Sequence, residues 1–201
     1  MGQSLGLIGL ARTGGAPQPV ADYLVRQQCA DGGFRQDPVI GRSCVRASGT
    51  SSVDTTALAL QALLTAREQG GVSVGKARIT RAVRYLVRSQ QDNGSFGTTR
   101  SANLSNANST GLAAQALSAA GRRRLAHDAR GFVRRLQITP RNATGTPARR
   151  DVGAVAFTRG ALAVALETGV TGATRDQFRR ATAQGSLVFV PVPLGSLAVP
   201  G

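Results

Sequence analysis

Two patterns of hydrophobic and polar positions alternate along the chain. Between residues 54 and 64, four leucines are separated mostly by alanine, so this segment is apolar nearly all round. A helix of that kind is buried on several sides. The helical segments that end at Gln28 and Gln90 carry Arg26, Arg84 and Arg88 and are expected to face water. The chain therefore predicts hairpins that pair an outer helix with a buried inner helix.

The same pair of patterns occurs twice. Residues 23–34 align with residues 85–96 at an offset of 62, with seven of twelve positions identical. Residues 54–63 align with residues 108–117 at an offset of 54, with six of ten identical. A repeat of this length is typical of stacked supersecondary units. The change of offset makes the first connecting loop longer than the second, and the longer loop carries Cys44.

Each unit is predicted to contain an outer helix, a glycine-phenylalanine turn, a polar loop and an inner helix. Asp54 and Asn108 are the expected N-caps of the two inner helices, since their side-chain oxygens can accept from free amides of the first turn.

Weaker copies flank the two clear units. Residues 3–12 resemble residues 59–67, residues 161–166 predict a third inner helix, and residues 175–185 predict another outer helix. Pro191, Pro193 and Pro200 predict an extended tail. We therefore expect an all-α repeat domain over residues 1–185, with about three hairpins, and an extended tail over residues 186–201.

Composition supports helices. Hydrophobic residues make up 41% of the 201 residues, aromatics only 4%, and tryptophan is absent. This content suits one domain of closely packed helices better than a β-sandwich.

The net charge of +15 suggests nucleic-acid binding as an alternative, but the pattern of basic residues argues against it. Every basic residue except Lys76 is arginine, and the arginine pairs lie among Ala and Leu at helical spacing without stacking aromatics. We expect them on solvated outer helices. The sequence holds no apolar run long enough to span a bilayer, and residues 5–11 lack the flanks of a signal peptide.

Cys29 and Cys44 lie 15 residues apart and are a candidate disulfide, which would imply an oxidising compartment. Two buried free thiols are the alternative. No metal site is expected, because His127 is the only histidine and lies far from both cysteines in the sequence.

The turns resemble a known family. The Gln28 and Gln90 turns are similar to the QW repeat of squalene and oxidosqualene cyclases, with Phe in place of Trp. They are closer to bacterial prenyltransferase/squalene-oxidase repeat proteins, and the resemblance covers roughly residues 1–185. It implies an α/α toroid of the terpene-cyclase type.

In that family the turn is structural. The glutamine can bond to the backbone at the start of the next helix, the glycine permits a positive φ, and the aromatic covers the joint. The matching residues are Gln28, Gly32, Phe34, Gln90, Gly94 and Phe96.

The catalytic residues of the family's enzymes have no counterpart here. The chain has no Asp-x-Asp-Asp acid motif and no Asp, Cys and His set for zinc. Asp54 is the only acid near the mouth of an inner helix. We therefore expect no catalytic residue and no bound cofactor or metal.

The sequence thus favours a non-catalytic repeat domain of an exported or surface protein of a bacterium, which binds a ligand or partner on its inner helices. One alternative is a fragment or degenerate relative of a terpene cyclase or prenyltransferase. Another is a cobalamin carrier, although no β-domain is visible. Since the chain supplies too few hairpins for a closed ring, it is expected to be a fragment, to have a misassigned start, or to be half of an open or self-associating ring.

Overall fold

The computed structural model describes residues 1–44, 51–100 and 105–197, and these residues are mostly helical. The α-helices are α1 (Gly2–Arg12), α2 (Gln18–Arg26), α3 (Val53–Gln69), α4 (Lys76–Ser89), α5 (Ala107–Ala119), α6 (Arg123–Arg134), α7 (Arg159–Thr168) and α8 (Arg175–Gly185). Short 3₁₀ turns are η2 (Pro147–Asp151), η3 (Ser186–Val188) and η4 (Leu194–Ser196). Strands β1 (Phe34–Arg35) and β2 (Ser51–Ser52) pair antiparallel. The all-α prediction is confirmed for the described residues.

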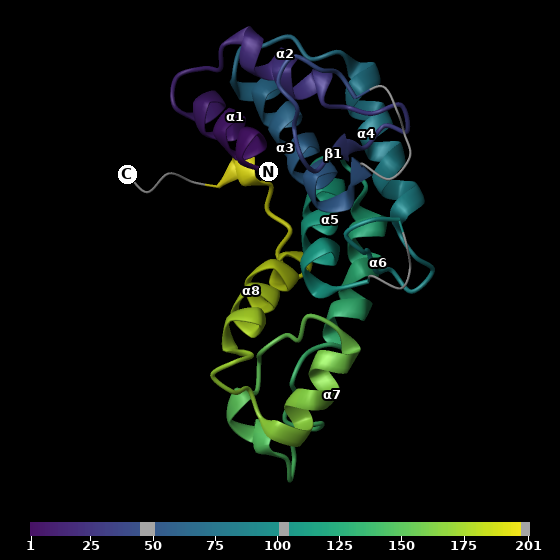
Figure 1. Ribbon diagram of the computed structural model, residues 1–201, viewed down its shortest axis with the longest axis vertical. Helices are drawn as coiled ribbons and strands as arrows, with labels where there is room; N and C mark the ends of the chain where they lie inside the picture. The colour runs from purple at the N-terminus through teal and green to yellow at the C-terminus, as the bar shows by residue number, and fades with distance from the viewer. Residues whose placement is uncertain (45–50, 101–104, 198–201) are drawn as a thin grey trace.

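Helix α3 lies at the centre of the main apolar core. It packs against α1, α4 and α5, and α5 packs in turn against α6 and α8 (Figure 1). Every residue of α3 from Thr55 to Ala66 is buried, as the apolar pattern of this segment predicted. Small alanines between the leucines let neighbouring helices approach α3 from several directions.

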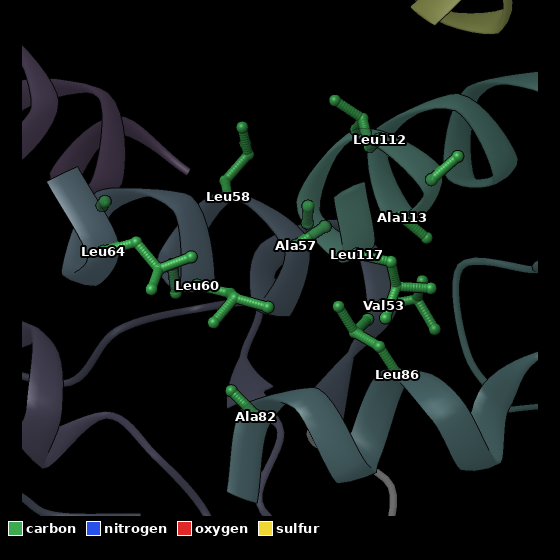
Figure 2. Packing of buried hydrophobic residues seen from close by; sticks show 14 of the residues in the cluster. Val53, Ala57, Leu58, Leu60, Leu64, Ala82, Leu86, Leu112, Ala113 and Leu117 are labelled. Carbon is green, nitrogen blue, oxygen red and sulfur yellow. The ribbon is translucent and has the colours of Figure 1, made fainter. Parts of the chain in front are cut away.

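Helices α4 and α6 are amphipathic and cover the outside. Leu60 of α3 points toward Ala82 and Leu86 of α4, whereas Leu58 points away from α4 (Figure 2). The exposed positions of both outer helices include arginines: Arg84 and Arg88 in α4, and Arg123, Arg124 and Arg134 in α6. Among the described residues, no helix is both long and apolar enough to cross a membrane.

The helix predicted at residues 161–166 is present as α7, but its assignment as a third inner helix was wrong. Helix α7 buries only Ala165 and belongs to a smaller second cluster with Phe178 and Ile138. Helix α8 packs against α5 instead. The reason is a close approach at Gly111 of α5, where a Cβ would lie 2.6 Å from the carbonyl carbon of Gln184.

The predicted N-caps were also wrong, by two residues each. Ser52 caps α3 by accepting from Thr55 N, and Asn106 caps α5 by accepting from Ser109 N over 2.9 Å. Both caps have extended backbone angles, whereas Asp54 and Asn108 already lie in the first helical turn. Ser52 and Asp54 are both polar, as are Asn106 and Asn108. The sequence pattern therefore could not show which residue of each pair is the N-cap and which lies in the first helical turn.

The tail after α8 is not extended throughout. Residues 186–188 continue from α8 as η3, and η4 follows Pro193, while residues 189–193 lack helical structure. The segment runs from α8 back past α5 toward α1 (Figure 1), where η4 contacts α1 and α3. Residues 198–201 of the predicted tail lie outside the described part of the chain.

Candidate binding face on the inner helices

Gln28 and Gln90 join each turn to the helix that follows it in the outer layer. Gln28 Nε2 donates to Gly32 O over 3.0 Å and to Arg78 O, in the first turn of α4, over 2.9 Å. Gln90 Nε2 donates to Gly94 O over 3.1 Å and to the Leu125 carbonyl in the first turn of α6, over 2.9 Å. Both glutamines therefore bond near the start of a following helix, as the sequence predicted.

Two structural features require glycine at positions 32 and 94 of these turns. Gly32 has a φ of +92° and Gly94 a φ of +83°, which other residues rarely adopt. A Cβ at position 32 would also lie 2.5 Å from Arg81 O, and one at position 94 would lie 2.7 Å from the carbonyl carbon of Asp128. Each turn is thus pressed directly onto the backbone of the next outer helix.

The phenylalanines connect the same turns to the inner helices. Phe34 N donates to Thr56 Oγ1 over 2.8 Å, and Phe96 N donates to Thr110 Oγ1 over 3.0 Å. Both aromatic rings are fully buried. All six turn residues therefore belong to the framework that sets the position of α3 and α5.

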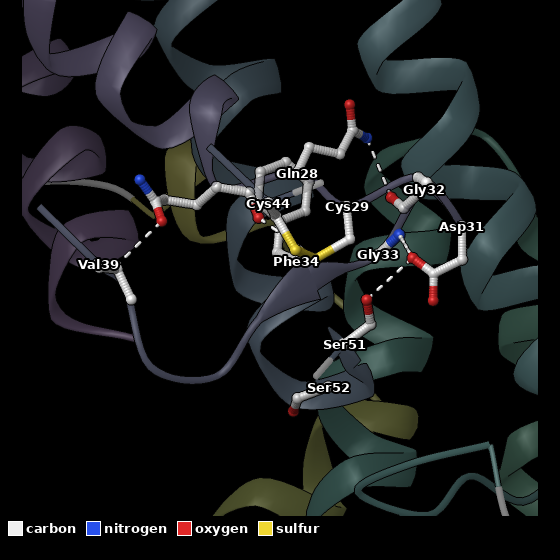
Figure 3. The surroundings of a disulfide bond; sticks show 12 residues. Gln28, Cys29, Asp31, Gly32, Gly33, Phe34, Val39, Cys44, Ser51 and Ser52 are labelled. Carbon is white, nitrogen blue, oxygen red and sulfur yellow. Dashed lines mark hydrogen bonds between the residues drawn. A yellow bond between two sulfur atoms is a disulfide. The ribbon is translucent and has the colours of Figure 1, made fainter. Parts of the chain in front are cut away.

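Cys29 and Cys44 form a disulfide, so the alternative of two free thiols is excluded for this structure. Their Cα atoms lie 4.6 Å apart, and Cys44 N also donates to Arg26 O. The bridge lies beside Phe34 (Figure 3) and holds part of the longer loop against the end of α2. The corresponding loop of the second repeat unit is shorter.

Two glutamines that the sequence reasoning did not single out lie at the centre of the inner helices. Gln61 of α3 and Gln115 of α5 are only 1% and 2% exposed, and Gln61 Nε2 donates to Gln115 Oε1 over 3.1 Å. They occupy the same position in the two aligned segments. The sequence did contain a signal for this pair, because a glutamine recurs at the same position of two otherwise apolar helices. A buried amide needs hydrogen-bond partners, so such a glutamine is expected to bond to another polar group.

The remaining polar atoms of this pair hold residues 189–197, which we call the C-terminal segment. Gln115 Nε2 donates to Val192 O over 2.6 Å, and Leu194 N donates to Gln61 Oε1 over 3.0 Å. The two side chains thus bind both a carbonyl and an amide of one peptide backbone. We call the side of α3 and α5 that the C-terminal segment covers the inner-helix face.

Further contacts along α3 and α1 extend this face. Gln69 Nε2 donates to Gly195 O over 3.0 Å, and Arg12 donates to the Leu197 carbonyl. Gly195 lies directly on Thr65, whose Cγ2 would be 2.8 Å from a Cβ at position 195. Neutral amides and a hydroxyl make most of these contacts, so this face is suited to recognising a ligand through hydrogen bonds.

Asp54, the acid that the sequence placed at the mouth of an inner helix, lies in the first turn of α3, whereas Glu68 is exposed near the end of the same helix. Burial raises the pKa of Asp54, and the nearby Ser109 hydroxyl partly offsets that rise. Buried oxygens without a hydrogen-bond partner surround the starts of α3 and α5: Asp54 Oδ1, Thr55 Oγ1, Asn108 Oδ1 and Ser109 Oγ. This cluster contains one carboxyl and lacks the second acid that an acidic catalytic dyad needs.

No metal centre is formed within residues 1–44, 51–100 and 105–197, where no three His, Cys, Asp or Glu side chains come together. His127 is exposed on α6. No family model matches the chain, and no curated protein matches it either.

Proposed function

We propose that this chain is a non-catalytic helical-repeat domain of the α/α-toroid type, which binds a ligand or partner on its inner-helix face. The observation that carries the proposal is the Gln61 and Gln115 pair. Two buried side chains from neighbouring inner helices direct hydrogen bonds to the backbone of Val192 and Leu194 in the C-terminal segment. Burying two amides is costly unless they are satisfied, so the pair favours a face that is built to be covered.

The repeat arrangement is supported by matching hydrogen bonds. The turns at Gln28 and Gln90 make the same contacts to their glycine and to the next outer helix, and the turns at Phe34 and Phe96 bond to equivalent threonines. Outer and inner helices alternate from α1 to α6. Such stacking is typical of an open part of a ring, and α8 departs from it.

An exported or surface location in a bacterium is part of the proposal. The Cys29–Cys44 disulfide supports it, because disulfides persist in oxidising compartments. Nucleic acid is not the proposed partner. The contacts that cover the inner-helix face are mainly neutral amides, whereas phosphate binding relies on clustered arginine or lysine.

The proposal is tested by uncovering the inner-helix face. Gly195→Leu places a side chain against Thr65 and is expected to expel the C-terminal segment. The variant should then bind the fluorescent probe 1-anilinonaphthalene-8-sulfonate saturably, at one site, while still unfolding cooperatively. Gly172→Leu is the matched control, because position 172 is exposed and has no neighbour within 4 Å of a Cβ. Equal probe binding by the two variants would refute a ligand-binding inner-helix face.

A further inference from the structure

We propose that the inner-helix face binds a proline-containing peptide of another protein by its main chain, and that the C-terminal segment occupies this groove as an intramolecular competitor. The proposal rests on the proposed function and specifies its ligand class and its regulation.

Recognition through the main chain follows from the register of the bonds. The groove accepts from Leu194 N, at the start of η4, and donates to Val192 O, two residues earlier in the chain. The stretch between them is fixed by local turns, because Val192 N donates to Val190 O over 2.8 Å and Ser196 N donates to Pro193 O over 2.9 Å. Backbone groups are common to all peptides, so these bonds set the direction and register of the ligand rather than its side chains.

The prolines define the conformation of the ligand. Pro191 and Pro193 flank Val192, and neither has an N–H that the groove would have to satisfy. Pro193 has a φ of −59° and a ψ of 142°, which is the polyproline II conformation. A peptide that already prefers this conformation loses less entropy on binding.

Gly195 supplies the specificity. Its carbonyl accepts from Gln69, and its Cα lies so close to Thr65 that any Cβ would clash with the Thr65 side chain. Thr65 is only 5% exposed, within the core helix α3, and cannot move aside easily. The preferred ligand therefore has the order proline, any residue, proline, apolar residue, glycine.

The C-terminal segment is held in a way that allows displacement. Its side chains Val190 and Leu197 are 67% and 45% exposed, and its apolar contacts to the main core come from the partly buried Phe189 and Leu194. Release would break hydrogen bonds, which contribute about 1 kcal/mol each, and would expose the partly buried side chains of Phe189 and Leu194. Segments with few buried apolar contacts are the ones that open locally.

The fit beneath the segment is also incomplete. A cavity of about 40 Å³ lies between Pro193, Gly195 and Ser196 of the segment and Thr65 and Gln69 of α3. A peptide that fills this space would gain contacts that the C-terminal segment lacks.

Because a ligand must compete with the C-terminal segment, we infer that it comes from another protein. A tethered segment has an effective concentration of about 1 mM, so an identical segment from a second copy would not replace it at ordinary protein concentrations. A peptide from another protein that binds more tightly can replace it. The C-terminal segment then sets a threshold affinity that a partner must exceed.

The test uses a fluorescent synthetic peptide with the sequence of residues 188–197. The Gly195→Leu variant should bind it at least about tenfold more tightly than the unaltered chain does, because its own segment no longer competes. A peptide that carries leucine in place of its glycine should bind at least about tenfold more weakly to the same variant. Equal affinities for the two peptides, or no binding, would overturn the proposal.

Comparing probe binding with peptide binding shows whether the peptide proposal alone fails or the proposed function fails with it. If Gly195→Leu binds the fluorescent probe but not the peptide, the peptide proposal fails while the proposed function stands; if it binds neither, both fail. If Gly195→Leu does not fold, peptide is added to the unaltered chain at a concentration well above the effective concentration of about 1 mM, and amide exchange at Leu194 is followed by NMR. Faster exchange would support displacement, and unchanged exchange would contradict it. A dimer of the unaltered chain that the peptide dissociates would assign the groove to a second copy and overturn the proposed source.

Discussion

Gln61 Nε2 donates to Gln115 Oε1 over 3.1 Å and thereby joins the middle of α3 to the middle of α5. Each glutamine has one further polar atom, and both of these atoms bond to the C-terminal segment. The pair therefore couples the packing of the inner helices to the occupancy of the face that they form. A side chain placed only for the core would not need this arrangement, because leucine packs there without hydrogen bonds.

Replacing Gln61 by leucine should loosen the C-terminal segment. Gln61→Leu leaves Leu194 N and Gln115 Oε1 without their partner, and it is expected to cost about 1 to 3 kcal/mol of unfolding free energy. Exchange of the Leu194 amide, measured by NMR, should be at least about tenfold faster. Gln177→Leu on the exposed side of α8 is the control, and equal effects of the two changes would show that the pair has no special role.

The close approach at Gly94 predicts a large loss of stability on adding one methyl group. Gly94→Ala has to accept a φ of +83° and a clash with the Asp128 carbonyl, so we expect a loss of about 3 kcal/mol or more. Gly121→Ala is the matched control, with a φ of +76° and nothing within 4 Å, and should lose about 1 to 2 kcal/mol. Urea denaturation measures the loss of unfolding free energy in both variants. Losses of the same size would contradict the close contact between Gly94 and the Asp128 backbone.

Asp54 predicts a dependence of stability on pH. Because burial raises its pKa in the folded state, the native protein holds the proton more tightly than the unfolded chain does. Stability from this group is therefore greatest below the unfolded pKa and is lost as pH rises through the folded pKa.

Asp54→Asn should therefore stabilise the protein at pH 7, and the gain should vanish below about pH 3.8. Asp176 is a suitable comparison, because it holds the same helical position in α8 but is exposed and pairs with Arg180 over 3.0 Å. Asp176→Asn should lower stability slightly at pH 7. Thermal unfolding across pH tests this pair, and a destabilised Asp54→Asn at pH 7 would contradict the burial effect.

Reduction of the disulfide should destabilise the protein. The bridge closes a loop with a sequence separation of 15, for which the chain-entropy model gives about 3 kcal/mol. Denaturation with and without a reducing phosphine measures the effect. The double variant Cys29→Ala with Cys44→Ala should not respond to the reductant, and an unchanged midpoint for the native chain would show that the bridge contributes little.

Local patterns were enough to predict the helical framework. The apolar pattern around Leu58 predicted a buried α3, the arginines of residues 84 and 88 predicted an exposed outer face for α4, and the repeat predicted how Gln28 and Gln90 bond. These features depend on periodicity and on turn chemistry within a few residues, and both can be read from the amino-acid order.

The sequence by itself thus determined the helices, the two turns and the candidate disulfide. Only the tertiary structure decided that α8 rather than α7 packs on α5, and that the C-terminal segment lies over Gln61 and Gln115. The alanine-rich surface of α7 does not specify one neighbour. Helix α8 packs on α5 because Gly111 allows its backbone at Gln184 to come close. The groove depends on bonds between residues 77 and 133 positions apart, which no local pattern encodes.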